Sequence, residues 1–274
     1  LVAKSVEGKI KFNEMKKDFI RNYLTLQQIK LEDYDNTVLN NYMPVSEILY
    51  GKSKNGGGSV YIWTQDDKAG ITIDEYFKNV SRSFRQNADS ELYRILCIMS
   101  SLTDFVKALH YGGFVHLDIK PSNFLLPYNG DRDINENAIS AFDINSLRHI
   151  DCRLPQEFSG TRGFSAPECE RGQGNDLSDI YSIGASLFYG ICLVPSSDGM
   201  ANLKYTGDFQ NIAGFIKNSY LIQSLKSSRK PYIESGLENI LQKCLHKNPR
   251  KRYISAKYLQ NDLKKLIVEA AVYV

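Results

Sequence analysis

The sequence of 274 residues has few cysteines, and no motif groups them. The five cysteines are scattered, and none of them stands in a Cys-x-x-Cys spacing: Cys97, Cys152, Cys169, Cys192 and Cys244. An odd, sparse set of this kind argues against a disulfide framework and against a structural zinc site. We therefore predict that the protein works in a reducing compartment, the cytoplasm.

The sequence also lacks an apolar run long enough to cross a membrane. The longest such run, residues 183–194, is interrupted by Ser186 and by glycines, and a spanning helix needs about 20 residues. No secretory signal peptide is recognisable. We predict a buried helix here and no membrane segment in this chain, although its abrupt ends suggest a piece of a longer protein.

Neither sign of charge dominates the chain. Lys and Arg number 34 against 31 Asp and Glu, which leaves a net charge of +3. This excess is too small to indicate nucleic-acid binding, so we interpret the basic runs at 226–230 and 247–252 as solvated faces. With 42% hydrophobic residues, the chain can bury the core of one large domain or of two tightly joined lobes.

The pattern of apolar residues changes near residues 65–70. Before this point, residues 1–6 favour a strand, residues 12–29 show helical spacing, and residues 47–50 and 59–64 flank a Gly-rich tip that predicts a hairpin. After it, helices and short strands are predicted. The helices cover 92–109, 179–192, 237–245 and 259–266, and the strands cover 124–126 and 138–144.

The most informative segment is His116-Leu-Asp-Ile-Lys-Pro-Ser-Asn123. It places a carboxylate, Asp118, shortly before Lys120 and Asn123. A hydroxyl nucleophile needs an acceptor for its proton, a transferring phosphoryl group needs positive charge beside its oxygens, and an amide oxygen can help to hold Mg²⁺. The pattern therefore favours phosphoryl transfer, with an ordinary solvated loop as the alternative.

This segment resembles the catalytic loop of the protein kinase family, and further motifs follow in the family's order. They are Ala141-Phe-Asp-Ile-Asn145, similar to Asp-Phe-Gly; residues 160–168, which end in Ala-Pro-Glu; residues 179–184, similar to the start of the central helix; and residues 244–252. The chain is thus identified as similar to a eukaryotic-like serine/threonine protein kinase catalytic domain. The segment Gly160-Thr-Arg-Gly-Phe164 resembles the corresponding segment of bacterial members of the family.

The resemblance implies roles for the residues around the phosphoryl group. Asp118 would be the catalytic base, and Lys120 would neutralise the γ-phosphate, as in serine/threonine rather than tyrosine kinases. Thr161 would bond near Asp118 and shape the site for the acceptor residue. His116 would be a packed, scaffolding histidine rather than a catalytic group or metal ligand.

The resemblance also implies metal, nucleotide and structural residues. Asn123 and Asp143 would hold Mg²⁺, which prefers oxygen ligands. Lys4, in Val-Ala-Lys, would bind the phosphates of ATP. Glu168 and Arg252 would form a partly buried ion pair that stiffens the helical lobe.

The amino-terminal part departs from the family. The Gly-rich phosphate loop that should precede Lys4 is missing, and residues 56–58 do not replace it because they form the hairpin tip. The family pairs this lysine with a glutamate on the following helix. The corresponding position in this sequence is Asn22, with Glu14 as an alternative. Asn22 can accept a hydrogen bond but carries no charge, so it cannot form that ion pair.

The helical part departs from the family at two positions. Asn145 stands where the family has the Gly of Asp-Phe-Gly, and Asn tolerates left-handed backbone better than most residues. Leu117 replaces the Arg that normally pairs with a phosphate on the activation loop. We predict that activity does not require phosphorylation at Ser159 or Ser165.

The resemblance implies a two-lobed α+β fold, with a partial amino-terminal lobe at 1–66 and a helical lobe at 67–274. ATP would bind in the cleft near residues 61–65, beside Thr64 or Trp63. The implied function is an ATP- and Mg²⁺-dependent kinase that acts on Ser or Thr of a protein substrate. The alternatives are a pseudokinase that binds nucleotide or acts as a scaffold and, with a poor fit to the Ala-Pro-Glu segment, a small-molecule kinase.

Overall fold

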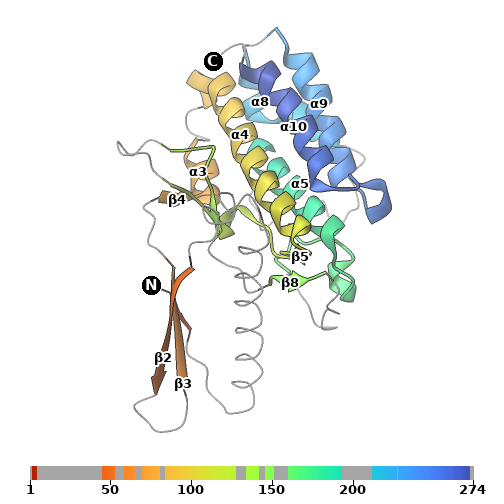
Figure 1. The fold of residues 1–274 in the computed structure, drawn as a ribbon. Helices are drawn as coiled ribbons and strands as arrows, with labels where there is room; N and C mark the ends of the chain where they lie inside the picture. Colours follow the sequence, from red (N-terminus) through yellow and green to blue (C-terminus); the bar gives the residue numbers. More distant parts are fainter. Residues whose placement is uncertain are drawn as a thin grey trace.

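The fold combines a small antiparallel sheet with a larger, mainly helical region, as Figure 1 shows. The computed structural model describes residues 2–4, 45–52, 59–65, 70–80, 84–127, 134–141, 146–150, 160–192, 212–226 and 228–271. This architecture confirms the predicted two-lobed α+β class. The helix expected over residues 12–29 lies outside the described residues.

The small sheet has three strands in the order β1-β3-β2. They are β1 (Val2–Lys4), β2 (Val45–Lys52) and β3 (Ser59–Gln65). Both pairings of β3 are antiparallel, with Tyr61 opposite Lys4 on one side and opposite Tyr50 on the other. The predicted hairpin is therefore confirmed, and both of its strands are longer than the sequence pattern suggested.

A short strand and a helix that the sequence analysis missed connect this sheet to the helical region. They are β4 (Gly70–Thr72) and α3 (Ile73–Val80). Helix α3 begins in a capping box, in which the Thr72 N–H donates to Glu75 Oε2 over 2.8 Å and the Glu75 N–H donates to Thr72 Oγ1 over 3.0 Å. Its buried residues, Ile73, Tyr76, Phe77 and Val80, have helical spacing.

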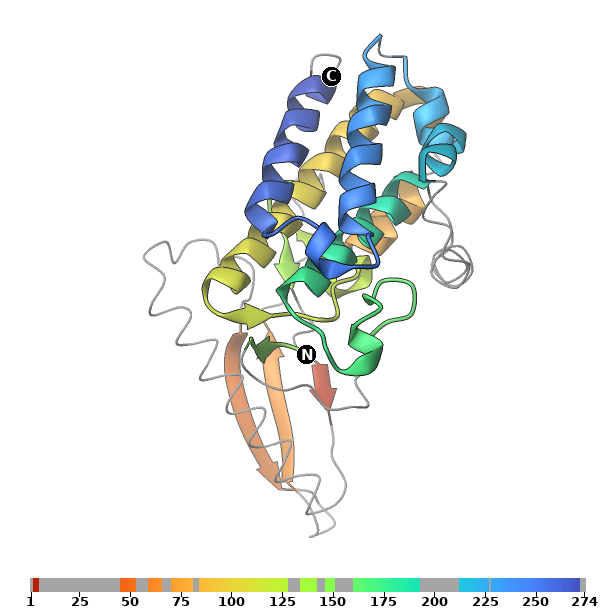
Figure 2. The same ribbon diagram turned by 90° about the vertical axis from the view of Figure 1, so that its right-hand side faces the viewer.

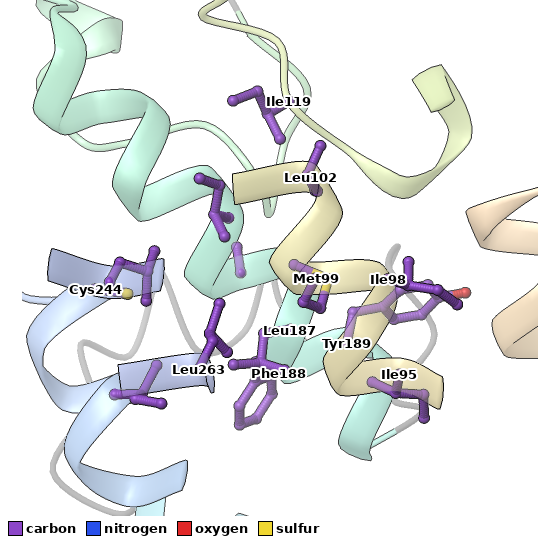
Figure 3. Close-up of a cluster of buried hydrophobic side chains, with 14 of the residues drawn as sticks. Ile95, Ile98, Met99, Leu102, Ile119, Leu187, Phe188, Tyr189, Cys244 and Leu263 are labelled. Carbon is purple, nitrogen blue, oxygen red and sulfur yellow. The ribbon is translucent and has the colours of Figure 1, made fainter. Parts of the chain in front are cut away.

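Four long helices build the core of the larger region. They are α4 (Phe84–Tyr111), α5 (Asp176–Cys192), α9 (Lys230–Cys244) and α10 (Ala256–Ala271). They confirm the predicted helices, and each begins several residues earlier than expected. Helix α5 is buried along nearly its whole length and contributes Leu187, Phe188 and Tyr189 to the apolar cluster of Figure 3. The short helices α7 (Ile212–Asn218) and α8 (Tyr220–Ser224) were not predicted.

Short strands bring the loops of the site together beside this core. Strand β5 (Phe114–Val115) pairs with β8 (Arg148–His149), and β6 (Phe124–Pro127) lies between β4 and β7 (Ser140–Ala141). Figure 2 shows these loops on the side of the helical region that faces the small sheet. The predicted strand at 124–126 is confirmed. Of the strand expected at 138–144, residues 140–141 form a strand, residues 138–139 do not, and residues 142–144 lie outside the described residues.

Among the helices in the described part of the chain, none combines the length and the apolar character that crossing a bilayer requires.

Candidate active site

The catalytic loop, residues 116–123, runs from β5 into a 3-10 turn at Pro121–Asn123 and then into β6. Its first residue, His116, is fully buried. The His116 ring centroid lies 6.2 Å from that of Phe105 and 5.6 Å from that of Phe124, and its Nδ1 accepts from the Asp118 N–H over 3.3 Å. These contacts suit the packed, scaffolding position expected for His116.

A buried carboxylate on α5 fixes the backbone of the loop. Asp179 is fully buried and accepts from the N–H groups of His116 over 2.8 Å and of Leu117 over 2.7 Å, and its Oδ2 lies 2.9 Å from His110 Nε2. Leu117 has a φ of 65°, a left-handed conformation that residues with a side chain rarely adopt. Hydrogen bonds from consecutive backbone amides to one carboxylate hold the loop in this unfavourable shape.

In the sequence, Asp179 is recognisable only as the start of a helix. The amides that it binds lie 63 and 62 residues away in the sequence, so no local pattern shows their pairing. Leu117 itself is buried, with 1% of its surface exposed, and packs in the core.

Hydrogen bonds hold the Asp118 carboxylate from both sides. Its Oδ1 accepts from Thr161 Oγ1 over 2.7 Å and from the Thr161 N–H over 3.2 Å, and its Oδ2 lies 3.1 Å from Lys120 Nζ. Lys120 Nζ also donates to Thr161 Oγ1 over 2.7 Å. Asn123 Nδ2 donates to the Asp118 carbonyl over 2.8 Å and to Oδ2 over 3.1 Å. The structure thus joins Asp118, Lys120, Asn123 and Thr161 in one network.

The charge state of Asp118 follows from this network. Burial by itself raises the pKa of Asp118, but the hydrogen bonds from Thr161 and Lys120, together with the Lys120 charge, outweigh burial and bring this pKa below its ordinary value. The carboxylate is therefore ionised at neutral pH and can accept a hydrogen bond from a hydroxyl group.

The acceptor segment, residues 160–168, supplies Thr161 to the network. The N–H groups of Phe164 and Ser165 donate to the Thr161 carbonyl over 3.1 and 3.0 Å, which folds the segment into a tight turn. Gly160 begins the turn in close contact with its neighbours. A Cβ at this position would lie 2.5 Å from Ser165 Oγ and 2.8 Å from Ser165 Cβ, so no larger residue fits without rearrangement.

The far end of the acceptor segment is anchored by the residues expected to form an ion pair. Arg252 Nη1 and Nη2 donate to Glu168 Oε1 and Oε2 over 2.6 and 2.9 Å, a bidentate arrangement. Ser178 Oγ donates to Glu168 Oε1 over 2.6 Å. Burial by itself raises the pKa of Glu168, but the Arg252 and Ser178 hydrogen bonds outweigh it and lower this pKa.

Among the residues expected to bind nucleotide or Mg²⁺, Lys120 and Asn123 belong to this network. The backbone of Lys4 lies in β1, and that of Thr64 lies in β3. Asp143, Asn145 and Asn22 lie outside the described residues. In the parts that the structure describes, no cluster of three or more His, Cys, Asp or Glu side chains forms a metal site.

Asn123 has the chemistry for one ligand of Mg²⁺. The side chain is buried, and its amide nitrogen is directed to Asp118 by the two hydrogen bonds described above. The amide oxygen is then the atom left for a cation, and it is a hard ligand of the kind that Mg²⁺ prefers. Asn123 therefore fits Mg²⁺ as one ligand, and its expected partner Asp143 lies outside the described residues.

Comparison with known proteins assigns the chain to a family. A family model described as "Protein kinase domain" matches residues 59–263, more than half of the chain. The match contains the catalytic loop, the acceptor segment and Arg252, whereas Lys4 lies outside it. The chain belongs to the protein kinase domain family.

Curated relatives from bacteria support the same conclusion. Serine/threonine-protein kinase D of Synechocystis is 26% identical over 218 residues, which cover 77% of this chain and 39% of that protein. Serine/threonine-protein kinase PrkC of Bacillus subtilis is 25% identical over 212 residues, 75% of this chain and 30% of that protein. Serine/threonine-protein kinase Pkn1 of Myxococcus xanthus is 27% identical over 183 residues, 64% and 24% respectively. The chain spans well under half of each of these relatives.

Proposed function

We propose that this chain transfers the γ-phosphoryl group of ATP to a serine or threonine hydroxyl of a protein substrate, in the presence of Mg²⁺. The observation that carries the proposal is the hydrogen-bond network that joins Asp118, Lys120, Asn123 and Thr161. It combines an ionised acceptor for the proton, a cation and an amide oxygen within one loop and the segment that contacts it. The names of the serine/threonine kinase relatives support the same reaction.

Each side chain has a separate task in this reaction. The substrate hydroxyl donates its hydrogen bond to Asp118, which orients the oxygen toward phosphorus and receives the proton. A new bond forms between this oxygen and the γ-phosphorus. The bond from phosphorus to the bridging oxygen breaks, and ADP leaves with its electron pair. The Lys120 ammonium stabilises the negative charge on the transferring group.

The other residues that the resemblance implied complete the proposal. Mg²⁺, when bound, neutralises phosphate charge, and Asn123 and Asp143 would hold it. Lys4 would bind the ATP phosphates from the small sheet. We assign residues 1–66 to the partial amino-terminal lobe and residues 67–274 to the helical lobe, and we place the protein in the cytoplasm.

The direct test is transfer of label from Mg-ATP to a generic basic protein and to the chain itself, in a form that includes a Gly-rich phosphate loop. Asp118→Asn should reduce kcat about a thousandfold, because the acceptor of the proton is lost while the shape is kept. Asp262→Asn is the matched control, since Asp262 lies on α10 and bonds Tyr253 and Lys265 instead. Equal transfer by native protein and Asp118→Asn would contradict the proposed role.

A pseudokinase is the second candidate. The observation in its favour is that the family match begins at residue 59, so Lys4 and its expected partner position, Asn22, lie outside the matched region. This candidate predicts saturable ATP binding without transfer to any protein. The same preparation, measured by ATP binding and by label transfer, separates the two functions.

A further inference from the structure

Helix α5 carries a tyrosine that contacts both α3 and the acceptor segment. The Tyr189 ring meets Phe164 edge-on, with centroids 6.0 Å apart and an interplanar angle of 90°, and it meets Phe77 of α3 at 6.0 Å and 66°. Only 3% of Tyr189 is exposed. Edge-to-face aromatic contacts add a directional preference to the burial of the rings. Tyr189 therefore connects two elements that lie far apart in the sequence.

The Tyr189 hydroxyl fixes the direction of this ring. It donates to Asp74 Oδ1 on α3 over 3.0 Å, and Asp74 Oδ2 in turn accepts from Lys78 Nζ over 2.6 Å. Figure 3 shows Tyr189 at the edge of the apolar cluster, with its oxygen pointing away from the cluster. Burial first, and the hydrogen bond to Asp74 second, raise the pKa of Tyr189, so the hydroxyl remains a donor.

Close packing of α5 on α3 limits how far the ring can shift. The residue after Tyr189 is Gly190, and a Cβ there would lie 2.7 Å from Phe77 Cζ. A glycine is required because the Phe77 ring lies directly against the backbone of α5. The Tyr189 ring is thus held by its hydroxyl at one end and by Phe77 along one side.

The same ring contacts the turn of the acceptor segment through Phe164. Phe164 is buried, with 5% of its surface exposed, and its N–H donates to the Thr161 carbonyl over 3.1 Å. A displacement of Phe164 therefore displaces Thr161, whose hydroxyl bonds Asp118 over 2.7 Å. A continuous series of contacts runs from Asp74 through Tyr189 and Phe164 to the Asp118 carboxylate.

We infer that Tyr189 is a positioning residue for the protein substrate. Through Phe164 it holds the turn of the acceptor segment, and through its hydroxyl it ties that turn to α3. The kinetic part of this inference rests on the proposed kinase function, whereas the structural part does not. Tyr189 touches no reacting atom, so its effect appears in binding and orientation of the acceptor protein.

Tyr189→Phe removes the hydroxyl and keeps the ring. We expect KM for the acceptor protein to rise about fivefold, the effect of losing one buried hydrogen bond, while KM for ATP stays within about twofold. Asp74→Leu should reproduce this rise. Asp74→Asn should restore a near-native KM, because its amide oxygen can still accept from Tyr189.

The matched control is Tyr253→Phe, which removes another buried tyrosine–aspartate bond, the one of 2.8 Å to Asp262. Amide hydrogen exchange provides a readout that needs no activity, since Phe164 and Ser165 N–H are protected by the Thr161 carbonyl. Faster exchange of these amides in Tyr189→Phe, but not in Tyr253→Phe, supports the inference. Equal exchange and equal acceptor KM in both variants would overturn it.

The two proposals fail in different ways. If the native chain transfers no phosphoryl group, the proposed function is wrong, and the exchange comparison still decides whether Tyr189 holds the segment. If the native chain is active and Tyr189→Phe raises the KM values for ATP and acceptor equally, the residue is merely structural and the inference is overturned.

Discussion

The catalytic loop and the acceptor segment are each held by a buried carboxylate, but the two carboxylates act in different ways. Asp179 binds the loop through the backbone N–H groups of His116 and Leu117. Glu168 belongs to the segment itself and is bound by the guanidinium of Arg252. One anchor fixes a backbone shape, and the other fixes a single end of a segment.

This difference explains which substitutions each region tolerates. Because Asp179 binds backbone amides, its hold on the loop does not require an arginine side chain at position 117, and a buried leucine is accepted there. The acceptor segment has its ion pair at one end only, so Thr161 depends on contacts with Asp118 and on the turn around Phe164. The loop is preformed, and the segment is positioned by its neighbours.

The largest expected effect on stability concerns the ion pair. Glu168→Gln leaves the Arg252 charge buried without a counter-charge, and we expect a loss of about 3–5 kcal/mol in the free energy of unfolding. Urea denaturation at neutral pH measures this loss. Arg229→Gln, which breaks an exposed pair with Glu269, should cost less than about 1 kcal/mol. Equal losses in both variants would contradict the account.

The pH dependence of the same effect has a defined sign. The folded-state pKa of Glu168 is lowered, so its stabilising contribution is complete above the ordinary carboxyl pKa and disappears as the pH falls through the lowered value. The difference between native protein and Glu168→Gln should therefore shrink in acid. A difference that grows as the pH falls would contradict the assigned direction.

Substitution of Asp179, which holds the catalytic loop, should have a smaller effect on stability and a clear effect on activity. Asp179→Asn replaces an acceptor oxygen by an NH₂ group and leaves one loop amide without its partner, at a cost of about 1–3 kcal/mol. Because the loop shape is lost, kcat should fall at least about tenfold. Asp176→Asn, in the first turn of the same helix, is the control and should remain active.

The smallest effect on activity is expected when a phosphorylation site in or next to the acceptor segment is removed. Ser159→Ala should change kcat/KM by less than about twofold, because Leu117 cannot pair with a phosphate. Ser165 is 4% exposed and does not offer its hydroxyl to another enzyme. Loss of activity in Ser159→Ala, rescued by an acidic residue, would show that phosphorylation is required after all.

Much of the fold could be predicted because its signals are local. The hairpin followed from two strand-like runs around a glycine-rich tip, and α4, α5, α9 and α10 followed from apolar periodicity. Helix α3 was missed although Thr72 and Glu75 form a capping box there, a pattern that could have been found. Helices α7 and α8 are short, and isolated helices of such length are not stable without tertiary packing.

The site could be predicted only as far as its motifs are contiguous. The loop from Asp118 to Asn123 was readable because consecutive residues share one task. Contacts between distant segments were not readable: the amides bound by Asp179 lie more than 60 residues away, and Asp74 lies 115 residues from Tyr189. Such pairs are set by helix packing, which the local sequence does not encode.

The most direct test of the account is the pH profile of kcat/KM for Thr161 variants. Thr161→Val loses the side-chain hydrogen bond to Asp118, so the pKa of Asp118 should rise and the acid limb should move to higher pH. Thr161→Ser keeps the hydroxyl and should retain the native profile, with its acid limb at lower pH than that of Thr161→Val. Identical profiles for the Val and Ser variants would contradict the claim that Thr161 holds Asp118 ready for the acceptor hydroxyl.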